Sequence, residues 1–159
     1  WVDWELELGV VIGSPLRLAS AEEALAAVAG YTIVDAISMR DWQTRTSQYL
    51  AGKTFEASTP VGPYLVTPDE IDPTEGLAMK LTVNGETRQE SSSDQLAIGV
   101  AEILADISQI ITLVPGDLIA TGTMAGVGHV RTPPVYLTDG DVVECSIEGL
   151  GSQTTRCRL

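Results

Sequence analysis

The stretch WELELGVVI, residues 4–12, first alternates apolar and acidic residues and then becomes continuously apolar. Alternation with a period of two residues is typical of a β-strand that has one polar face, and a continuous apolar run indicates burial on both faces. The stretch therefore predicts a strand that begins with a polar face and then runs into the core.

Further β-branched and apolar runs, each bounded by turn residues, predict more strands. The Asn84-Gly85 pair between two of these runs is the strongest short signal for a β-hairpin. The predicted strands cover residues 31–37, 61–66, 79–83, 86–89, 118–121, 142–147 and 152–158.

Two segments have helical patterns. Ser20 and Glu23 fit a capping box at the start of an alanine-rich run that extends to Ala29, with Gly30 as the stop. Apolar residues at helical spacing predict a second helix from Ser93 through Ile107. We therefore expect a mainly β fold of the α+β class with two short helices, forming a single domain over residues 1–159.

The charge balance limits the kinds of partner. The 159 residues include 9 Lys and Arg against 22 Asp and Glu, for a net charge of −13. Nucleic acids and anionic membranes are bound by clustered cations, so this composition argues against both. No apolar run reaches the roughly 20 residues of a membrane helix, and no signal peptide is recognisable.

The cysteines and the first residue give two further expectations. Cys145 and Cys157 lack CxxC spacing and are too few for a disulfide scaffold, which predicts free thiols and a cytoplasmic protein. Because the sequence opens on Trp1 rather than Met, we expect that the natural N-terminus lies upstream.

Glu5 and Glu7 are the first candidates for chemistry. They are two residues apart on a predicted strand, so their side chains leave the same face. Neighbouring carboxylates repel one another unless solvent or a cation separates them, and carboxylate oxygens suit Mg²⁺, Mn²⁺ or Ca²⁺. The alternative interpretation is an ordinary solvated strand face.

Arg40, Gln43 and Lys53 lie in a polar stretch that follows a predicted buried strand. An Arg can hold a substrate carboxylate through a bidentate contact, and a partly desolvated Lys can act as a general acid/base or stabilise an oxyanion. The alternative is that these cations only balance nearby acidic residues at the surface.

A glycine-rich segment at residues 120–128 contains Gly122, Gly126 and Gly128 and matches neither a Walker A motif nor a dinucleotide fingerprint. Such a loop lets backbone N–H groups approach an anion, although it can equally be a turn between strands. His129, the only histidine, follows directly. With no Ser or Cys motif beside it, the sequence does not assign it a catalytic role.

Taken in order, several segments make the chain similar to the fumarylacetoacetate hydrolase family. These segments occur in the family's order and cover nearly the whole sequence. They are VDWELELGVVIG (2–13), AGYT (29–32), SMRDWQ (38–43), GKTF (52–55), PVGP (60–63), VNGE (83–86), PGD (115–117), TGT (121–123) and IEGLG (147–151).

The resemblance implies a mixed β-roll, usually a homodimer, that holds Mg²⁺ or Mn²⁺ at a site for a small 2-oxo or β-diketo acid. The leading expectation is metal-dependent hydrolysis of a C–C bond in an acylpyruvate type of substrate. Decarboxylation, isomerisation and a metal-free cyclisation in a biosynthetic pathway are the alternatives among reactions. A catalytically inactive binding or scaffold subunit is the alternative outside enzymes.

The resemblance also implies roles for individual residues. Glu5 and Glu7 correspond to metal carboxylates, and Thr123 to a hydroxyl that meets the substrate carboxylate. Arg40, Gln43 and Lys53 correspond to catalytic and substrate-binding side chains, with Arg40 and Lys53 stabilising the developing negative charge.

Two departures from the family pattern affect these expectations. The position that resembles the third metal carboxylate is Ala36, preceded by Asp35. A step of one residue along a strand reverses the face, so Asp35 can replace that ligand only through a local bulge. Without such a bulge, Ala36 indicates either an engineered substitution or a natural loss of metal chemistry. In the family, the lid that carries a catalytic His and Glu lies upstream of the strand at 4–12, so the resemblance assigns that role to no residue here. We expect that the 1–159 domain lacks this segment, either because it was omitted or disordered or because the water-activating groups are missing.

Overall fold

Strand β2 (Leu6–Ile12) is the central strand of a three-stranded sheet in the computed structural model, which describes residues 1–158. It lies between β3 (Val28–Asp35) and β7 (Leu118–Thr123), and both pairings are antiparallel. The expected strand at residues 4–12 is therefore confirmed at its centre. Its acidic face is not solvated, because Glu5 and Glu7 are both buried.

The second sheet has four antiparallel strands in the order β6-β5-β8-β9. The positive φ angles of Asn84 (51°) and Gly85 (79°) form the tight turn between β5 and β6, which confirms the predicted hairpin. The strands span Ala78–Val83 (β5), Glu86–Ser92 (β6), Val142–Ile147 (β8) and Gly151–Arg156 (β9).

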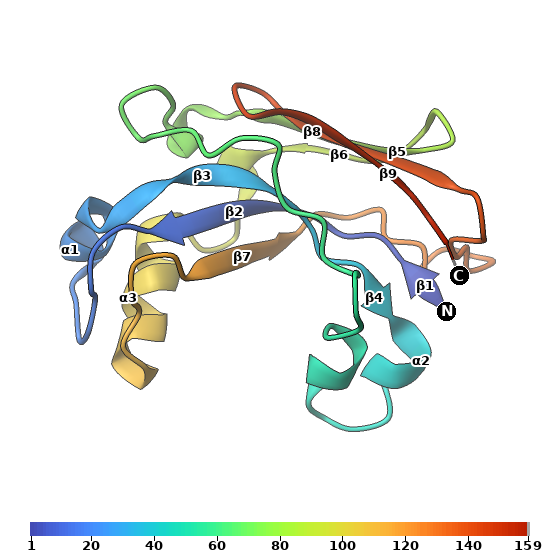
Figure 1. The fold of residues 1–159 in the computed structure, drawn as a ribbon, viewed down its shortest axis with the longest axis horizontal. Helices are drawn as coiled ribbons and strands as arrows, with labels where there is room; N and C mark the ends of the chain where they lie inside the picture. Colours follow the sequence, from blue (N-terminus) through green and yellow to red (C-terminus); the bar gives the residue numbers. More distant parts are fainter. Residues whose placement is uncertain (159) are drawn as a thin grey trace.

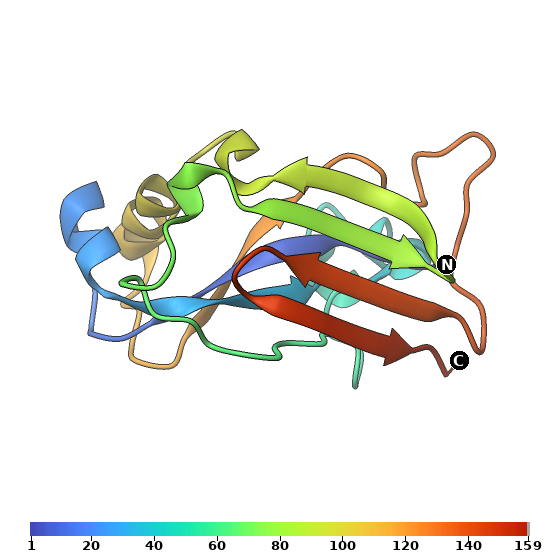
Figure 2. The same cartoon turned by 90° about the horizontal axis from the view of Figure 1, so that it is seen from above.

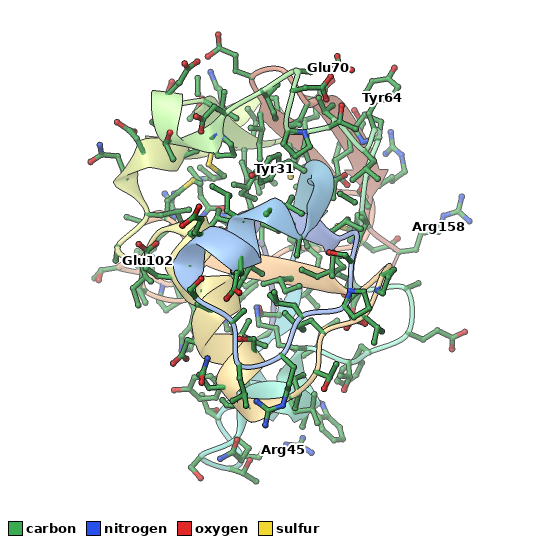
Figure 3. The ribbon with its side chains drawn as sticks, turned by 90° about the vertical axis from the view of Figure 1, so that its left-hand side faces the viewer. Tyr31, Arg45, Tyr64, Glu70, Glu102 and Arg158 are labelled. Carbon is green, nitrogen blue, oxygen red and sulfur yellow. The ribbon has the colours of Figure 1, made fainter. Side chains whose placement is uncertain are left out.

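The two sheets form two layers, with the four-stranded sheet above β3-β2-β7 (Figure 1) and spread across it when viewed from above (Figure 2). The apolar core includes Trp4, Leu81 of β5, Val143 of β8 and four side chains of β2, namely Leu6, Leu8, Val10 and Ile12. In Figure 3, Tyr31 lies within the body of the molecule, whereas Arg45 projects at the end that carries α2. Successive side chains along residues 4–8 point to opposite faces, so Glu5 and Glu7 lie on the face opposite the core residues Trp4, Leu6 and Leu8.

Two helices, α1 and α3, cover one end of the sheets, and the short elements β1, β4 and α2 lie at the other end (Figure 1). Helices α1 (Ala21–Ala26) and α3 (Val100–Ile110) lie against each other. At the other end, β1 (Val2–Asp3) pairs with β4 (Ser38–Met39), which leads directly into the single-turn helix α2 (Arg40–Gln43). The short 3₁₀ helices are η1 (Tyr49–Gly52), η2 (Pro73–Glu75) and η3 (Ser93–Gln95).

The mainly β fold class is confirmed, and α2 is a helix in addition to the two that were predicted. Most strand boundaries agree to within about three residues, and three elements differ more substantially. The capping box of Ser20 and Glu23 is present, yet α1 ends at Ala26, and Gly30 is part of β3 rather than a helix stop. A side chain at Gly30 would collide with the Val66 carbonyl oxygen, so close strand packing explains this glycine.

The other two differences concern residues 93 and 61–66. Ser93 begins the 3₁₀ helix η3, and the α-helix starts only at Val100, because Ser93 bonds to Leu77 and Pro73 in a loop. The predicted strand at 61–66 is reduced to isolated bridges of Val61 and Val66 with β3.

Within residues 1–158, none of the helices has the length and apolarity needed to cross a bilayer. Both Cys145 and Cys157 are free thiols, in agreement with the sequence prediction. Burial raises the pKa of both thiols, so the thiolate form is disfavoured and neither is a good nucleophile.

Candidate active site

A cavity of about 850 Å³ opens on the side of β2 opposite the core, beside β7 and the segment from β4 to η1. Five of the six predicted site residues line this cavity, and Ala36 and His129 line it with them. The five are Glu5, Glu7, Arg40, Gln43 and Lys53.

Glu5 lies between the two predicted cations. Its Oε1 forms an ion pair with Arg40 Nη2 at 2.7 Å, and its Oε2 accepts a hydrogen bond from Lys53 Nζ at 2.6 Å. Lys53 also donates to the carbonyl oxygen of Ala36 at 3.0 Å. The Lys53 side chain retains 27% of its exposure while Arg40 retains 6%, so the ammonium group is the more accessible of the two cations.

Asp3 organises this part of the site, although the sequence analysis did not identify it. Its carboxylate is fully buried and accepts from Arg40 Nε at 2.9 Å, from Gly128 N at 2.7 Å and from His129 N at 2.9 Å. A single buried carboxylate therefore fixes both Arg40 and the loop after β7. Gly128 is required here, because a Cβ atom would collide with the carbonyl oxygen of Val135.

Gln43 completes the support of Arg40. One turn of α2 brings the Gln43 side chain back to Arg40, whose Nη1 donates to Gln43 Oε1 at 2.9 Å. The guanidinium thus contacts Asp3, Glu5 and Gln43, and its planar array of donors is held in one orientation.

Glu7 lies one pleat further along β2, and its Oε2 accepts a hydrogen bond from the backbone N–H of Gly122 at 2.6 Å. Burial raises the pKa of Glu7, and the nearby Glu5 carboxylate adds to that effect. The glycine-rich loop therefore contributes an N–H donor to this site, as its composition suggested, although the anion it binds is a side chain of the protein itself.

Asp35 and Ala36 lie on opposite sides of the chain. Ala36 lines the cavity, whereas Asp35 is buried outside it, with its Oδ1 accepting from Glu5 N at 3.1 Å and its Oδ2 unpartnered. A bulge that would turn Asp35 into the cavity is not observed. Burial raises the pKa of Asp35 to about 6, because the ionised form has lost its water.

The residues present do not form the three-carboxylate metal site that the resemblance implies. Both oxygens of Glu5 are paired with cations of the chain, one oxygen of Glu7 bonds to Gly122, and Ala36 presents a methyl group. Across residues 1–158, no group of three His, Cys, Asp or Glu side chains is arranged to hold a metal. The assignment of Mg²⁺ or Mn²⁺ to Glu5 and Glu7 thus stays a prediction.

Thr123 lies outside this cavity and lines a neighbouring one. Its hydroxyl donates to the Leu6 carbonyl oxygen at 2.8 Å and accepts from Gln89 Nε2 at 2.9 Å. The buried Gln89 also accepts from Leu6 N, so it connects the two sheets through its side-chain amide. Thr123 therefore does not line the cavity that holds the other five candidates, and a contact between Thr123 and substrate stays a prediction.

His129 is a second residue of this site, besides Asp3, to which the sequence assigned no role. It lines the cavity, and its Nδ1 lies 2.9 Å from the hydroxyl oxygen of Tyr136. In the sequence, the only indication that His129 belongs to a site is its position directly after the glycine-rich segment. That position is equally consistent with an ordinary loop residue.

Replacing Asp35 by Asn is expected to change how stability depends on pH. A folded-state pKa of about 6, above the ordinary 3.8, means that protonated Asp35 favours the folded state and that this contribution is lost as the pH rises from about 4 through 6. Between pH 4 and 7 the wild type should lose roughly 3 kcal/mol relative to Asp35→Asn. Urea unfolding of both proteins at each pH measures the difference, and parallel pH profiles would contradict it.

The family model described as fumarylacetoacetate (FAA) hydrolase C-terminal matches residues 1–158. The chain belongs to the fumarylacetoacetate hydrolase family. It is 46% identical over 151 residues to the mitochondrial oxaloacetate tautomerase Fahd2a of Rattus norvegicus, an alignment covering 94% of this chain and 48% of that protein. The chain thus spans about half the length of this relative.

Solved structures agree with this assignment. The fumarylacetoacetate hydrolase of Exiguobacterium antarcticum superimposes with a TM-score of 0.94 at 43% identity, covering 98% of this chain and 56% of that one. The fumarylpyruvate hydrolase of Pseudomonas aeruginosa, in complex with Mn²⁺ and pyruvate, gives a TM-score of 0.88 at 34% identity, with 98% and 65% covered. These three relatives are named as enzymes, and each name states an oxo acid.

Proposed function

We propose that this chain forms the catalytic part of an enzyme that acts on a small 2-oxo or β-diketo acid by stabilising its enolate. The observation that carries the proposal is the pair of cations, Arg40 and Lys53, that flanks Glu5 in the cavity. Fixed cations placed where negative charge develops are among the largest contributions to enzyme catalysis. The names of the relatives support the substrate class.

Lys53 is the group suited to meet the developing oxyanion. An ammonium has three N–H donors, and two of them are used by Glu5 and the Ala36 carbonyl. The third can donate to a substrate oxygen in the cavity that Lys53 lines. Arg40 contributes fixed positive charge beside it, and its contacts with Asp3 and Gln43 hold the guanidinium in place.

For the reaction we propose hydrolysis of the C–C bond of an acylpyruvate. The oxygen of water adds to the acyl carbonyl carbon, and the C–C bond then breaks. The electron pair of that bond passes to the pyruvate fragment as its enolate, which takes up a proton to give pyruvate. The presence of pyruvate in the complex of the fumarylpyruvate hydrolase relative supports this assignment.

Keto–enol isomerisation of a 2-oxo acid is the second candidate, because the chain is 46% identical to a protein named oxaloacetate tautomerase. This reaction passes through the same enolate without breaking a C–C bond. A bound Mg²⁺ or Mn²⁺ would supply Lewis-acid chemistry, but the oxygens of Glu5 are paired with Arg40 and Lys53, so the donor set at Glu5 and Glu7 is incomplete. A homodimer remains part of the proposal.

Replacing Lys53 by Met is expected to lower kcat/KM by about 10²–10³, because one oxyanion-stabilising donor is lost. The measurement is steady-state hydrolysis of fumarylpyruvate and tautomerisation of oxaloacetate by the full-length protein. Lys80→Met is the matched control, since Lys80 is exposed on β5 and lies outside the cavity.

Either of two results would contradict the proposal. Equal activity of Lys53→Met and Lys80→Met would remove Lys53 from the reaction. Pyruvate binding that is unchanged in Arg40→Ala and Lys53→Ala, in a protein without turnover, would instead favour a binding or scaffold subunit.

A further inference from the structure

We propose that the cavity binds a 2,4-dioxo acid that has one carboxylate and an uncharged alkyl acyl group, and that Val34, Ala120 and Leu118 contact this acyl group. The inference rests on the proposed function, because it specifies the substrate class of the same site. Three features support it: the gathering of the cations at one end, an apolar wall that continues from that end along β2, and the packing of this wall over Gly9.

The cationic side chains of the cavity gather at one end. Arg40 and Lys53 both pair with Glu5, and Arg40 also pairs with Asp3. His129 lies at the same end, because its backbone N–H donates to Asp3 at 2.9 Å. Among residues 1–158, Arg40 and Lys53 are the only Lys or Arg side chains that line the cavity. This end can therefore stabilise the carboxylate and the developing oxyanion of one oxo-acid group.

The cavity continues from the charged end over an apolar wall, which consists of Val34 of β3 and of Ala120 and Leu118 of β7. Val34 lies two residues before Ala36, whose carbonyl oxygen accepts from Lys53 Nζ at 3.0 Å. Two residues of a strand span about 7 Å, so the wall begins about 7 Å from the backbone that holds the ammonium group.

The strand register places the rest of the wall further from the cations. Val34 lies opposite Glu7 on β2, and Ala120 lies opposite Gly9. Leu118 lies one pleat beyond Ala120, in the direction away from Glu5. The wall thus extends about 13 Å along β2, starting where the charged end stops. A substrate whose oxo-acid group lies near Lys53 would direct its acyl chain along this wall.

Gly9 explains how closely the wall is packed. A Cβ atom on Gly9 would lie 2.7 Å from Val34 Cγ2, 2.9 Å from Thr32 Cγ2 and 3.2 Å from Leu118 Cδ1. Methyl groups from β3 and β7 therefore converge over Gly9 and form a continuous apolar surface. Such a surface is stabilised by contact with another apolar group, and it offers no donor to a carboxylate.

Glu7 makes this part of the cavity still less suited to a second substrate carboxylate. Glu7 lines the cavity at the start of the wall, and its Oε2 already accepts from the backbone N–H of Gly122 at 2.6 Å. The second carboxylate of a compound such as fumarylpyruvate would lie near Glu7 and the wall without a cation beside it. Loss of its hydration would then be uncompensated, whereas an alkyl group of similar length has no such cost.

Steady-state release of pyruvate by the full-length protein tests the inference with acetylpyruvate, hexanoylpyruvate, crotonoylpyruvate and fumarylpyruvate. Each hydrolysis consumes one water and yields pyruvate and one further carboxylic acid. A fully buried methylene is worth about fourfold in a binding constant, so kcat/KM for hexanoylpyruvate should exceed that for acetylpyruvate by at least about tenfold. Crotonoylpyruvate has a methyl group where fumarylpyruvate has its second carboxylate, and its kcat/KM should be at least about tenfold higher.

Two variants assign this preference to the wall. Leu118→Gln should lower the ratio of kcat/KM for hexanoylpyruvate to that for acetylpyruvate by about threefold or more, because an amide replaces an apolar contact. Leu25→Gln is the matched control, since Leu25 is similarly exposed, on α1, and lies outside the cavity. Ala120→Lys should raise the ratio for fumarylpyruvate to crotonoylpyruvate by about threefold or more, because it adds a cation to the wall.

Several outcomes would overturn the inference while leaving the proposed function intact. Equal kcat/KM for acetylpyruvate and hexanoylpyruvate would indicate that another part of the protein, rather than the substrate, covers the wall. Fumarylpyruvate hydrolysed as efficiently as crotonoylpyruvate, or Leu118→Gln with the same selectivity as Leu25→Gln, would also overturn it. A wild type that hydrolyses none of the four compounds and does not tautomerise oxaloacetate would overturn both the inference and the proposed function.

Discussion

Ala36→Asp is expected to raise the affinity of the full-length protein for Mn²⁺ by about 100-fold. Ala36 lines the cavity together with Glu5 and Glu7, so a carboxylate at this position would join the other two on one side of the chain. Hard divalent cations prefer such sets of oxygen ligands. Calorimetric titration with Mn²⁺ measures the change, and thermal unfolding should show stabilisation by Mn²⁺ that is larger in the variant.

Ala36→Asn is the matched control, because it adds an oxygen of similar size without the charge. It should gain much less affinity than Ala36→Asp. Tight Mn²⁺ binding by the wild type would show that two carboxylates suffice here. If neither the wild type nor Ala36→Asp binds Mn²⁺, metal chemistry is removed from the proposed function. Turnover by the wild type that persists in excess chelator would likewise show that its reaction needs no metal.

Arg40→Ala is expected to lower the free energy of unfolding by about 3–5 kcal/mol, since it removes the cation shared by two buried carboxylates. Arg40 Nη2 lies 2.8 Å from Asp3 Oδ2 and 2.7 Å from Glu5 Oε1, and none of the three side chains is more than 12% exposed. Urea unfolding at pH 7 measures the loss.

Arg156→Ala provides the comparison on the surface. Arg156 is exposed and donates one hydrogen bond, to the carbonyl oxygen of Gly140, so its removal should change stability by no more than about 0.5 kcal/mol. Equal losses of stability in Arg40→Ala and Arg156→Ala would contradict the buried charge network.

Local sequence patterns predicted those parts of the fold that local interactions determine. Strand β2 and the Asn84-Gly85 hairpin follow from alternation and turn chemistry, and both are present. The boundaries that were wrong depend on distant contacts. Gly30 resembles a helix stop in sequence, but its close approach to the Val66 backbone places it in a strand.

The candidate site likewise divides into residues that local sequence patterns predict and residues that depend on distant contacts. Motif spacing identified Glu5, Arg40 and Lys53, and the structure brings these three together. It could not identify Asp3 or Gln89, whose partners are reached only after folding: Asp3 bonds to Gly128 across 125 positions, and Gln89 bonds to Leu6 across 83. Buried polar groups of this kind leave no periodic signal, because each is one residue satisfied by tertiary contacts.

The buried carboxylate of Asp3 has a consequence for how mutational surveys of this protein should be interpreted. It holds the guanidinium of Arg40 and the backbone of Gly128 and His129 at once. A substitution there would disturb the electrostatics and the shape of the cavity in a single event. In a scan scored by turnover, Asp3 would rank with residues that contact the reacting molecule, although it has no exposed surface with which to do so.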